Sequence, residues 1–184
     1  MRKDTKIVVT GSAGLLGQNL VAELSRQGYT NITALDKHSG NLYIQQTLHP
    51  DVHCAQADLA LPGGWEEHFE GAEALFLLQA QITGQTFDPF QRNTIDSTAN
   101  VLSAAKKHAV PFTVFVGSSV VNSVADDNYT RSKKMQEAMM RDSGLAHCIA
   151  RPTLMFGWFD PTHLGWLSRF MPKTPVFPVP GHGR

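Results

Sequence analysis

The chain has 184 residues, of which 42% are hydrophobic, so it is long enough to bury the core of one globular domain. Sixteen Lys and Arg residues balance sixteen Asp and Glu residues, and this neutral charge argues against nucleic acid or an anionic membrane surface as a partner. The apolar stretches 74–78 and 110–116 are far shorter than the ~20 residues of a membrane span, and no secretory signal pattern follows Met1, so a cytoplasmic protein is expected.

Short β-branched runs alternate with segments of helical period along the chain. This pattern is typical of parallel strands buried on both faces by crossover helices, and it predicts an α/β fold. Strands are expected, in chain order, at 6–10, 31–36, 52–56, 74–78, 113–118 and 146–151. Helices are expected at 14–26, 89–108 and 129–143, with weaker helical turns at 42–48 and 65–69.

A glycine-rich loop, Thr10-Gly11-Ser12-Ala13-Gly14-Leu15-Leu16-Gly17, joins the first predicted strand to the first predicted helix. Such a turn lets the backbone approach a pyrophosphate, and the helix N-terminus presents free N–H groups and a partial positive charge. The spacing is G-x-x-G-x-x-G, and glycines that merely permit tight packing are the alternative. The strand before the loop and the apolar stripe after it favour a dinucleotide site. Its predicted contacts are Gly11, Ala13, Gly14, Leu15, Leu16 and Gly17.

Acidic residues follow the second and third predicted strands. Asp36 lies nineteen residues after the last glycine of the loop, where a carboxylate accepts hydrogen bonds from the adenosine ribose. It also repels a 2′-phosphate, so NAD is expected rather than NADP, although Lys37 and His38 oppose this preference. Asp58, with Leu59 beside it, is placed to meet the adenine. The alternative for each acid is an ordinary turn or cap residue.

Cysteine and histidine spacing predicts neither a disulfide nor a metal site. Cys54 and Cys148 are isolated in the sequence, and we expect both to be buried, reduced thiols. His49 and His53 are four residues apart, but Pro50 interrupts any helix between them and no third ligand is near in sequence.

Candidate catalytic residues follow the fifth predicted strand. The segment Tyr129-Thr130-Arg131-Ser132-Lys133 opens a helix and places a phenol and an ammonium on one helical face. A tyrosine pKa near 10 must fall by about three units for the side chain to act as a base near neutral pH, and a nearby ammonium and a helix N-terminus favour this. Ser119 ends the preceding strand at the same sheet edge as the glycine-rich loop, so it is a candidate to hydrogen-bond the reacting oxygen. Alone, the Y-x-x-x-K spacing is weak evidence, and a strand-end serine is often a turn residue.

With these motifs in order, the chain resembles the extended short-chain dehydrogenase/reductase family, the NAD-dependent epimerases and dehydratases. The matching segments are 6–11, Ser118-Ser119, 129–133 and Arg151-Pro152-Thr153-Leu154-Met155-Phe156-Gly157. The resemblance implies a Rossmann-like, doubly wound parallel sheet in three α/β/α layers, bound NAD, proton transfer by Tyr129 with Lys133 and Ser119, and hydride transfer at the substrate carbon. It also implies a homodimer through helices 89–108 and 129–143. Further implied cofactor contacts are Leu78, Ala80, Tyr129, Lys133 and Pro152.

Several departures from the family pattern bear on function. The family normally continues well beyond this length to close over the substrate. Ser119 and Tyr129 are only ten residues apart, so the loop that helps to line the substrate site is short. Residues 77–80 read Leu-Leu-Gln-Ala where the family often has His-Leu-Ala-Ala. The register of 100–105 puts Thr94 rather than Asn93 at the usual asparagine position, and a one-residue shift would restore Asn93.

We expect residues 1–157 to form the cofactor domain and residues 158–184 to begin a C-terminal substrate-binding region. A helix is predicted at 162–171, and the prolines near the end of the chain exclude a helix there. Val176, Phe177 and Val179 are expected to need burial. The aromatic residues before them are expected to pack against further C-terminal structure rather than to stack on a ligand, namely Trp158, Phe159, Trp166 and Phe170.

Two functions remain open. The first is an NAD-dependent oxidoreductase or epimerase acting on a hydroxyl or keto carbon of a small molecule, most plausibly a sugar nucleotide, with Tyr129 as general base and acid. The second is a dinucleotide-binding regulatory or scaffold protein with weak or no turnover. The complete set of Ser119, Tyr129 and Lys133 favours the first, and the short loop between Ser119 and Tyr129 favours the second.

Overall fold

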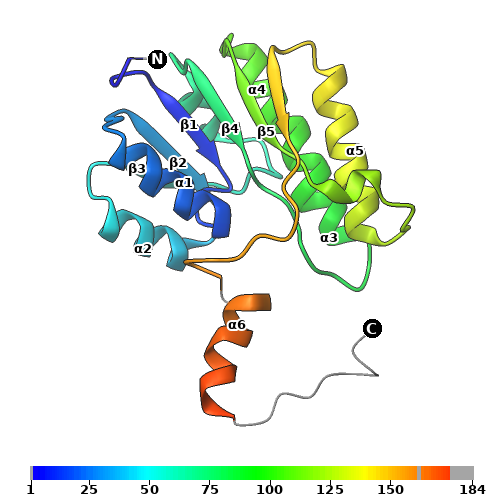
Figure 1. Ribbon diagram of the computed structural model, residues 1–184. Coiled ribbons are helices and arrows are strands. Elements are labelled where there is room, and N and C mark those ends of the chain that lie inside the picture. Colours follow the sequence, from blue (N-terminus) through cyan, green and yellow to red (C-terminus); the bar gives the residue numbers. More distant parts are fainter. Residues whose placement is uncertain (1, 161–162, 175–184) are drawn as a thin grey trace.

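The computed structural model describes residues 2–160 and 163–174, and within them the chain forms a six-stranded parallel sheet (Figure 1). The strands lie in the order β3-β2-β1-β4-β5-β6. Their bounds are Ile7–Thr10 (β1), Ile32–Asp36 (β2), His53–Gln56 (β3), Ala74–Leu77 (β4), Thr113–Val116 (β5) and His147–Ala150 (β6). Each strand lies within a predicted range. The order reverses between β1 and β4, which is the switch point of a doubly wound sheet, so the predicted Rossmann-like α/β fold is confirmed.

Helices α1, α5 and α6 agree with the sequence analysis, and the other helical segments differ from it in extent or type. Their bounds are Leu15–Arg26 (α1), Ser39–Leu48 (α2), Asp88–Phe90 (α3), Ser97–Lys107 (α4), Asn128–Asp142 (α5) and His163–Phe170 (α6). The weak helical turn expected at 42–48 is a full helix, and the turn at 65–69 is a 3₁₀ helix over Gly64–Phe69. The helix predicted at 89–108 is confirmed as one unbroken helical run, from α3 through the π-helical segment Gln91–Asp96 to α4, and only the π-helical turns were not expected.

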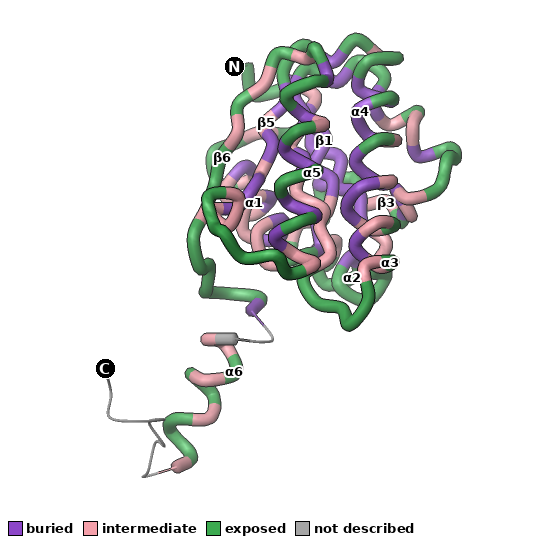
Figure 2. Tube along the Cα trace, turned by 90° about the vertical axis from the view of Figure 1, so that its right-hand side faces the viewer, coloured by how far each residue is buried: buried purple, intermediate pink, exposed green. Residues whose placement is uncertain are grey.

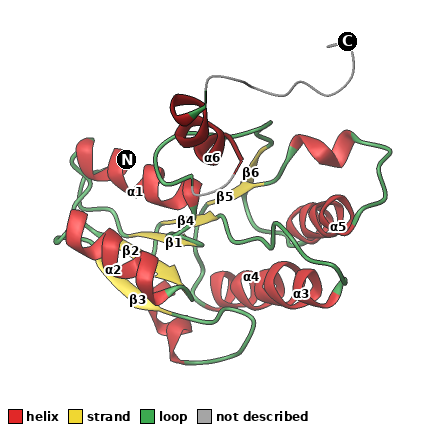
Figure 3. Ribbon diagram, turned by 90° about the horizontal axis from the view of Figure 1, so that it is seen from below, coloured by secondary structure: helices red, strands yellow, loops and turns green. Residues whose placement is uncertain are grey.

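Two apolar clusters cover opposite faces of the sheet. Alternate residues Ile7 and Val9 of β1 pack with Val21 and Leu24 of α1, whereas Val8 belongs to the cluster on the other face. That second cluster joins β4 and β5 to α4 and α5 through Leu75, Leu77, Phe115, Val101, Leu102 and Met140. Figure 3 shows α1 on one side of the sheet and α4 with α5 on the other. Because β1 and β2 are covered on both faces, every residue in them is buried.

The strand β6 lies at one edge of the sheet and is only partly covered. Cys148 and Ala150 are exposed, and His147 and Ile149 are partly buried. Cys148 pairs with Val114 of β5 on the α1 side of the sheet, and the described residues leave this face of β6 open. The prediction that Cys148 is buried is therefore wrong, and Cys54 on β3 is partly buried.

After β6, the chain crosses below the C-terminal ends of the strands and then forms α6, which extends away from the α/β body (Figures 1 and 2). Figure 2 shows buried residues gathered in the strands and along α4, with mainly exposed residues at the chain's C-terminal side. Trp158 is 84% exposed and Trp166 is 56% exposed. Among the residues described, no helix has the length and apolar composition that would let it cross a membrane. The expectations for Val176, Phe177 and Val179 lie outside the described residues.

Candidate active site

The C-terminal ends of four neighbouring strands bring the predicted site residues to one edge of the sheet. The glycine-rich loop follows β1, Asp36 ends β2, Leu78 follows β4 and Ser119 lies three residues after β5. In a doubly wound sheet, ligands bind at this edge beside the switch point.

The three glycines of the loop meet different steric demands. Gly11 has a φ of +69°, and a Cβ there would lie 2.6 Å from the backbone nitrogen of Gln79. A Cβ on Gly17 would lie 2.3 Å from the carbonyl oxygen of Ser12, so this glycine allows α1 to pack against the loop. A Cβ on Gly14 would meet only the Gly11 carbonyl oxygen at 3.5 Å, and Gly14 itself is exposed. The loop is thus closely packed from inside and open at Gly14.

The open side of the loop suits an anionic ligand. Gly14 is the N-cap of α1 and has no side chain to satisfy the first N–H groups of the helix. Three buried polar atoms in and beside the loop lack a hydrogen-bond partner among the described residues: Ser12 Oγ, Gln18 Oε1 and Gln79 Nε2. Two of them are donors that a phosphate oxygen can satisfy. The residues present therefore fit the pyrophosphate of a dinucleotide.

Asp36 is held in a defined orientation beside this loop. Its Oδ2 accepts a hydrogen bond from the backbone N–H of Ala13 at 3.1 Å, and its Oδ1 accepts one from the backbone N–H of His38 at 2.9 Å. The ring Nδ1 of His38 also lies 2.9 Å from Oδ1. A carboxylate offers about four acceptor positions, so capacity remains for ribose hydroxyls.

A polar network lies beside the C-terminal ends of β2 and β3. Asp58 pairs with Arg92 from the π-helical segment, and its Oδ1 accepts a hydrogen bond from Ala60 at 3.2 Å. Burial raises the pKa of Asp58, but the Arg92 and Ala60 hydrogen bonds outweigh this effect and hold it below its ordinary value. Lys37 Nζ donates to Asn93 Oδ1 at 2.9 Å. Asp58 is thus already engaged with Arg92, a partner that sequence reasoning missed because it lies far along the chain.

The π-helical segment gives Asn93 and Thr94 separate positions. Thr94 is fully buried, and its Oγ1 accepts a hydrogen bond from the backbone N–H of Gln81 at 2.8 Å. Asn93 faces Lys37 and donates through Nδ2 to Gln81 Oε1 at 2.8 Å. A π turn contains more residues than an α turn, so it shifts the register of the helix locally. Both side chains consequently reach the segment that follows β4.

Four other predicted cofactor contacts differ in their burial and in their backbone hydrogen bonds. The side chain of Leu59 is buried in the apolar core, which leaves only its backbone for a ligand contact. Leu78 and Ala80 are partly buried where the chain leaves β4, and the Leu78 N–H donates to Thr10 O at 3.1 Å. Pro152 accepts a hydrogen bond from the Ser119 N–H at 3.0 Å, which joins the segments that follow β5 and β6.

The helix α5 begins at a capped N-terminus that carries Tyr129 in its first turn. Asp127 is the N-cap, and it accepts hydrogen bonds from the Thr130 N–H at 2.9 Å and from the Thr130 hydroxyl at 2.7 Å. These bonds hold the pKa of Asp127 below its ordinary value. Tyr129 is the second residue of this helix and is partly buried.

Lys133 lies one turn further along α5 and is 2% exposed. Its Nζ donates to the carbonyl oxygen of Val116, the last residue of β5, at 3.0 Å and to Gln136 Oε1 at 2.6 Å. Burial lowers the pKa of Lys133 to about 7, and the nearby charge of Glu137 opposes this effect. The structure therefore brings the Lys133 ammonium to the end of the strand that leads to Ser119.

Glu137 ties α5 to the end of β6. It is nearly buried, and its carboxylate pairs with Arg141 at 2.9 Å and with Arg151 at 2.5 Å. The Arg151 hydrogen bond is the main cause that holds the pKa of Glu137 below its ordinary value, against the effect of burial. This ion pair supports the helix that carries Tyr129 and Lys133.

The segment after Gly157 passes beside the start of α1. Asn19 Nδ2 donates to the carbonyl oxygen of Trp158 at 2.9 Å. A hollow of about 730 Å³ lies between the first loop and this segment, and Ala13, Gln18, Asn41, Phe156 and Trp158 are among the residues that line it. The chain after β6 thus crosses the same sheet edge that carries the glycine-rich loop.

Comparisons with known proteins agree with this geometry. The model of the NAD dependent epimerase/dehydratase family matches residues 7–174. A ceramide reductase from Caulobacter vibrioides is 26% identical over 178 residues, which cover 94% of this chain and 53% of the reductase. WbmH from Bordetella bronchiseptica in complex with NAD+ is 18% identical with a TM-score of 0.80, over 92% of this chain and 63% of that one. UDP-glucuronic acid 4-epimerase from Bacillus cereus in complex with NAD is 19% identical with a TM-score of 0.72, over 83% of this chain and 58% of the epimerase chain.

These matches bear on the fold, the cofactor and the extent of the chain. The solved structures share the Rossmann-like fold, and both hold NAD, the cofactor expected from the sequence. The chain spans about half the length of the curated relative and less than two thirds of each solved structure.

Proposed function

Because the chain belongs to the NAD-dependent epimerase/dehydratase family, we propose that it serves as an oxidoreductase or epimerase acting on a hydroxyl or keto carbon. The observation that carries the proposal is the contact of Lys133 Nζ with the carbonyl oxygen of Val116. It joins the helix of Tyr129 to the end of β5, at the edge that also carries the glycine-rich loop.

In the proposed reaction, the hydroxyl of Tyr129 exchanges a proton with the substrate oxygen, and Ser119 donates a hydrogen bond to the same oxygen. Lys133 in its charged form stabilises the negative charge that develops on the phenol oxygen as the proton leaves. NAD supplies the hydride acceptor when it is bound. The loop from Gly11 to Gly17 would hold its pyrophosphate, and Asp36 would hold its adenosine ribose, with further contacts at the predicted positions Lys37, Asp58, Leu59, Leu78, Ala80 and Pro152.

For the substrate, we propose a small molecule of the sugar-nucleotide class. Support comes from the likeness to a solved UDP-glucuronic acid 4-epimerase. The likeness to a ceramide reductase supports a competing substrate class, a lipid with a carbonyl group. We propose residues 1–157 as the cofactor domain and residues 158–184 as the start of the substrate region, in a cytoplasmic protein. The ten-residue spacing of Ser119 and Tyr129 favours the alternative, a dinucleotide-binding regulatory protein.

The cofactor part of the proposal is tested by replacing Asp36 with asparagine. We expect Asp36→Asn to weaken NAD binding roughly 10-fold, because hydrogen bonds from ribose hydroxyls to a charged acceptor are lost. NADP binding should weaken by less than NAD binding, because Asp36→Asn also removes the repulsion between the carboxylate and the 2′-phosphate of NADP. Isothermal titration calorimetry of both cofactors measures the two effects. Equal NAD affinity in the variant and the wild type would remove Asp36 from the cofactor site.

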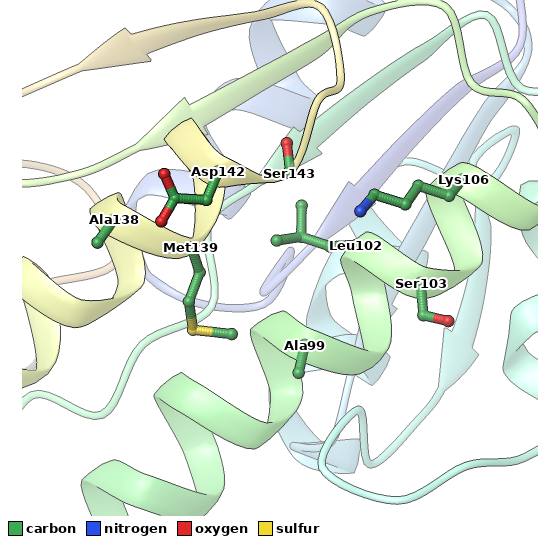
Figure 4. A pocket seen from close by; sticks show the side chains of 8 residues that line it. All are labelled: Ala99, Leu102, Ser103, Lys106, Ala138, Met139, Asp142 and Ser143. Carbon is green, nitrogen blue, oxygen red and sulfur yellow. The ribbon is translucent and has the colours of Figure 1, made fainter.

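We also propose that two copies pair through α4 and α5. A hollow lies between these helices, and Figure 4 shows the side chains that α4 and α5 contribute to its lining. Its lining includes Ala99, Leu102, Ser103, Lys106, Ala138 and Met139. The exposed residues Ala99 and Ala138 are small and let a second helix pair approach closely, and the partly buried Met139 supplies apolar contact area.

Placing a charge in this hollow tests the pairing. We expect the wild type to sediment as a dimer and Ala99→Glu to sediment as a monomer with unchanged circular dichroism, because an unpaired carboxylate would be buried at the interface. Thr47→Glu, on the exposed surface of α2, is the matched control and should leave the dimer intact. A wild type that is monomeric at micromolar concentration would contradict the proposal.

A further inference from the structure

A buried glutamine lies beside the ammonium of Lys133. Gln136 follows Lys133 by three residues in α5, and its side chain is fully buried. Lys133 Nζ donates to Gln136 Oε1 at 2.6 Å and to Val116 O at 3.0 Å. An ammonium has three N–H donors, so the protein's own acceptors take two of the three.

The side-chain amide of Gln136 has one consistent orientation. Its Nε2 donates to the carbonyl oxygen of Gln79 at 3.1 Å and to the hydroxyl oxygen of Thr98 at 2.8 Å. A carbonyl oxygen only accepts and an ammonium only donates. Turning the amide over would therefore set two acceptors together at Gln79 and two donors together at Lys133. The contacts around the amide require Oε1 to face Lys133.

The same network reaches the glycine-rich loop. The side chain of Gln79 accepts a hydrogen bond from the Thr10 hydroxyl at 2.6 Å, and Gly11 packs against the Gln79 backbone. Thr98 is fully buried in α4. Gln136 is therefore anchored by hydrogen-bond partners that lie outside its own helix, on α4 and on the segment after β4.

Building on the proposed function, we propose that Gln136 is a positioning residue for Lys133. It holds the ammonium at the end of β5 and leaves the third N–H for the nicotinamide ribose of NAD. The contacts of Gln136 join α5 to α4 and to the segment after β4, so they become visible only once these elements are assembled.

The groups around Lys133 leave Gln136 as the side chain that accepts a hydrogen bond from its ammonium. Glu137 is the acidic neighbour that favours the charged form of Lys133, but its carboxylate is engaged by Arg141 and Arg151. The groups contributed by β5, α4 and the segment after β4 are neutral, namely the Phe115 ring, the Val116 carbonyl, Thr98 and Gln79. Gln136 Oε1 is therefore the side-chain acceptor in direct contact with the ammonium.

An NMR titration of Lys133 tests this role without requiring turnover. The full chain is labelled with [13Cε]lysine, and Lys133→Met assigns the signal. The wild-type signal should titrate with a midpoint at about 7. Gln136→Met should lower the midpoint by about one pH unit, because a hydrogen bond to the charged form is lost, and Gln136→Glu should raise it by adding a negative charge.

A buried glutamine elsewhere supplies the control. Gln45 is fully buried and donates through Nε2 to the Ser12 carbonyl oxygen, so Gln45→Met removes a comparable hydrogen bond away from Lys133. It should leave the Lys133 midpoint unchanged. If Gln136→Met does not fold, Thr98→Val takes its place, since it removes one anchor of the Gln136 amide and should shift the midpoint in the same direction by less.

Calorimetry separates this inference from the proposed function. Gln136→Met should weaken NAD binding about 10-fold and leave the binding of ADP, which lacks the nicotinamide ribose, unchanged. A Lys133 midpoint equal to that of the wild type in both Gln136 variants overturns the inference. If the wild type binds no NAD but the midpoints move as expected, the proposed function fails and the positioning of Lys133 by Gln136 stands.

Discussion

Replacing Tyr129 with phenylalanine is expected to lower turnover at least about 100-fold, the usual contribution of a positioned proton donor or acceptor. NAD affinity should stay nearly unchanged. The substitution removes only the hydroxyl, and the N-cap of α5 depends on Asp127 and Thr130 rather than on the phenol. Turnover is measured with a panel of sugar nucleotides and of lipid or small-molecule ketones and alcohols. Net oxidation or reduction is measured by NADH absorbance, and epimerisation, which returns the hydride and leaves no net NADH, is measured by chromatography of the products.

The control for Tyr129→Phe is the same change at an exposed tyrosine. Tyr43 on α2 is 74% exposed, so Tyr43→Phe should leave both turnover and NAD affinity at their wild-type values. Equal turnover of Tyr129→Phe and the wild type would exclude Tyr129 from the chemistry. A wild type that binds NAD but turns over no compound of the panel would instead favour the regulatory alternative.

Replacing Gly17 with alanine is expected to destabilise the fold by about 3 kcal/mol and to abolish measurable NAD binding. The added Cβ would lie 2.3 Å from Ser12 O and 2.5 Å from Gly11 O. Both are backbone atoms, so α1 and the loop must move apart to accommodate it. Urea denaturation measures the free energy of unfolding, and calorimetry measures NAD binding.

Two other glycines provide the comparison for Gly17→Ala. Gly40 in α2 has open space around its Cβ position, and Gly40→Ala should stabilise the protein by roughly 0.5 kcal/mol through helix propensity. Gly14→Ala meets its nearest atom at 3.5 Å, so it should keep the fold and weaken NAD binding by filling the open side of the loop. Wild-type stability in Gly17→Ala would show that the close packing of α1 on the loop is not required.

Much of the fold was predictable because the signals that carry it are local. Burial on both faces gives β1 and β2 continuous apolar character, and the turn between β1 and α1 needs glycine for steric reasons that act within a few residues. Asp36 and Ser119 were predicted at strand ends and Tyr129 at a helix start. These three residues could be placed at one edge of the sheet, because parallel strands all end on the same side. The structure puts each of these residues at the end of an element on that edge.

The sequence by itself determined the α/β class, the six strands and the glycine-rich turn between β1 and α1, since these depend on periodicity and on local backbone requirements. Only the tertiary structure decided that β6 lies at an edge of the sheet. This position is the reason that Cys148 is exposed. Likewise, only the assembled fold pairs Asp58 with Arg92 and sets Gln136 between Lys133 and Gln79. These contacts join side chains from separate helices and strand ends, and no periodicity within one segment encodes which distant partner a polar side chain meets.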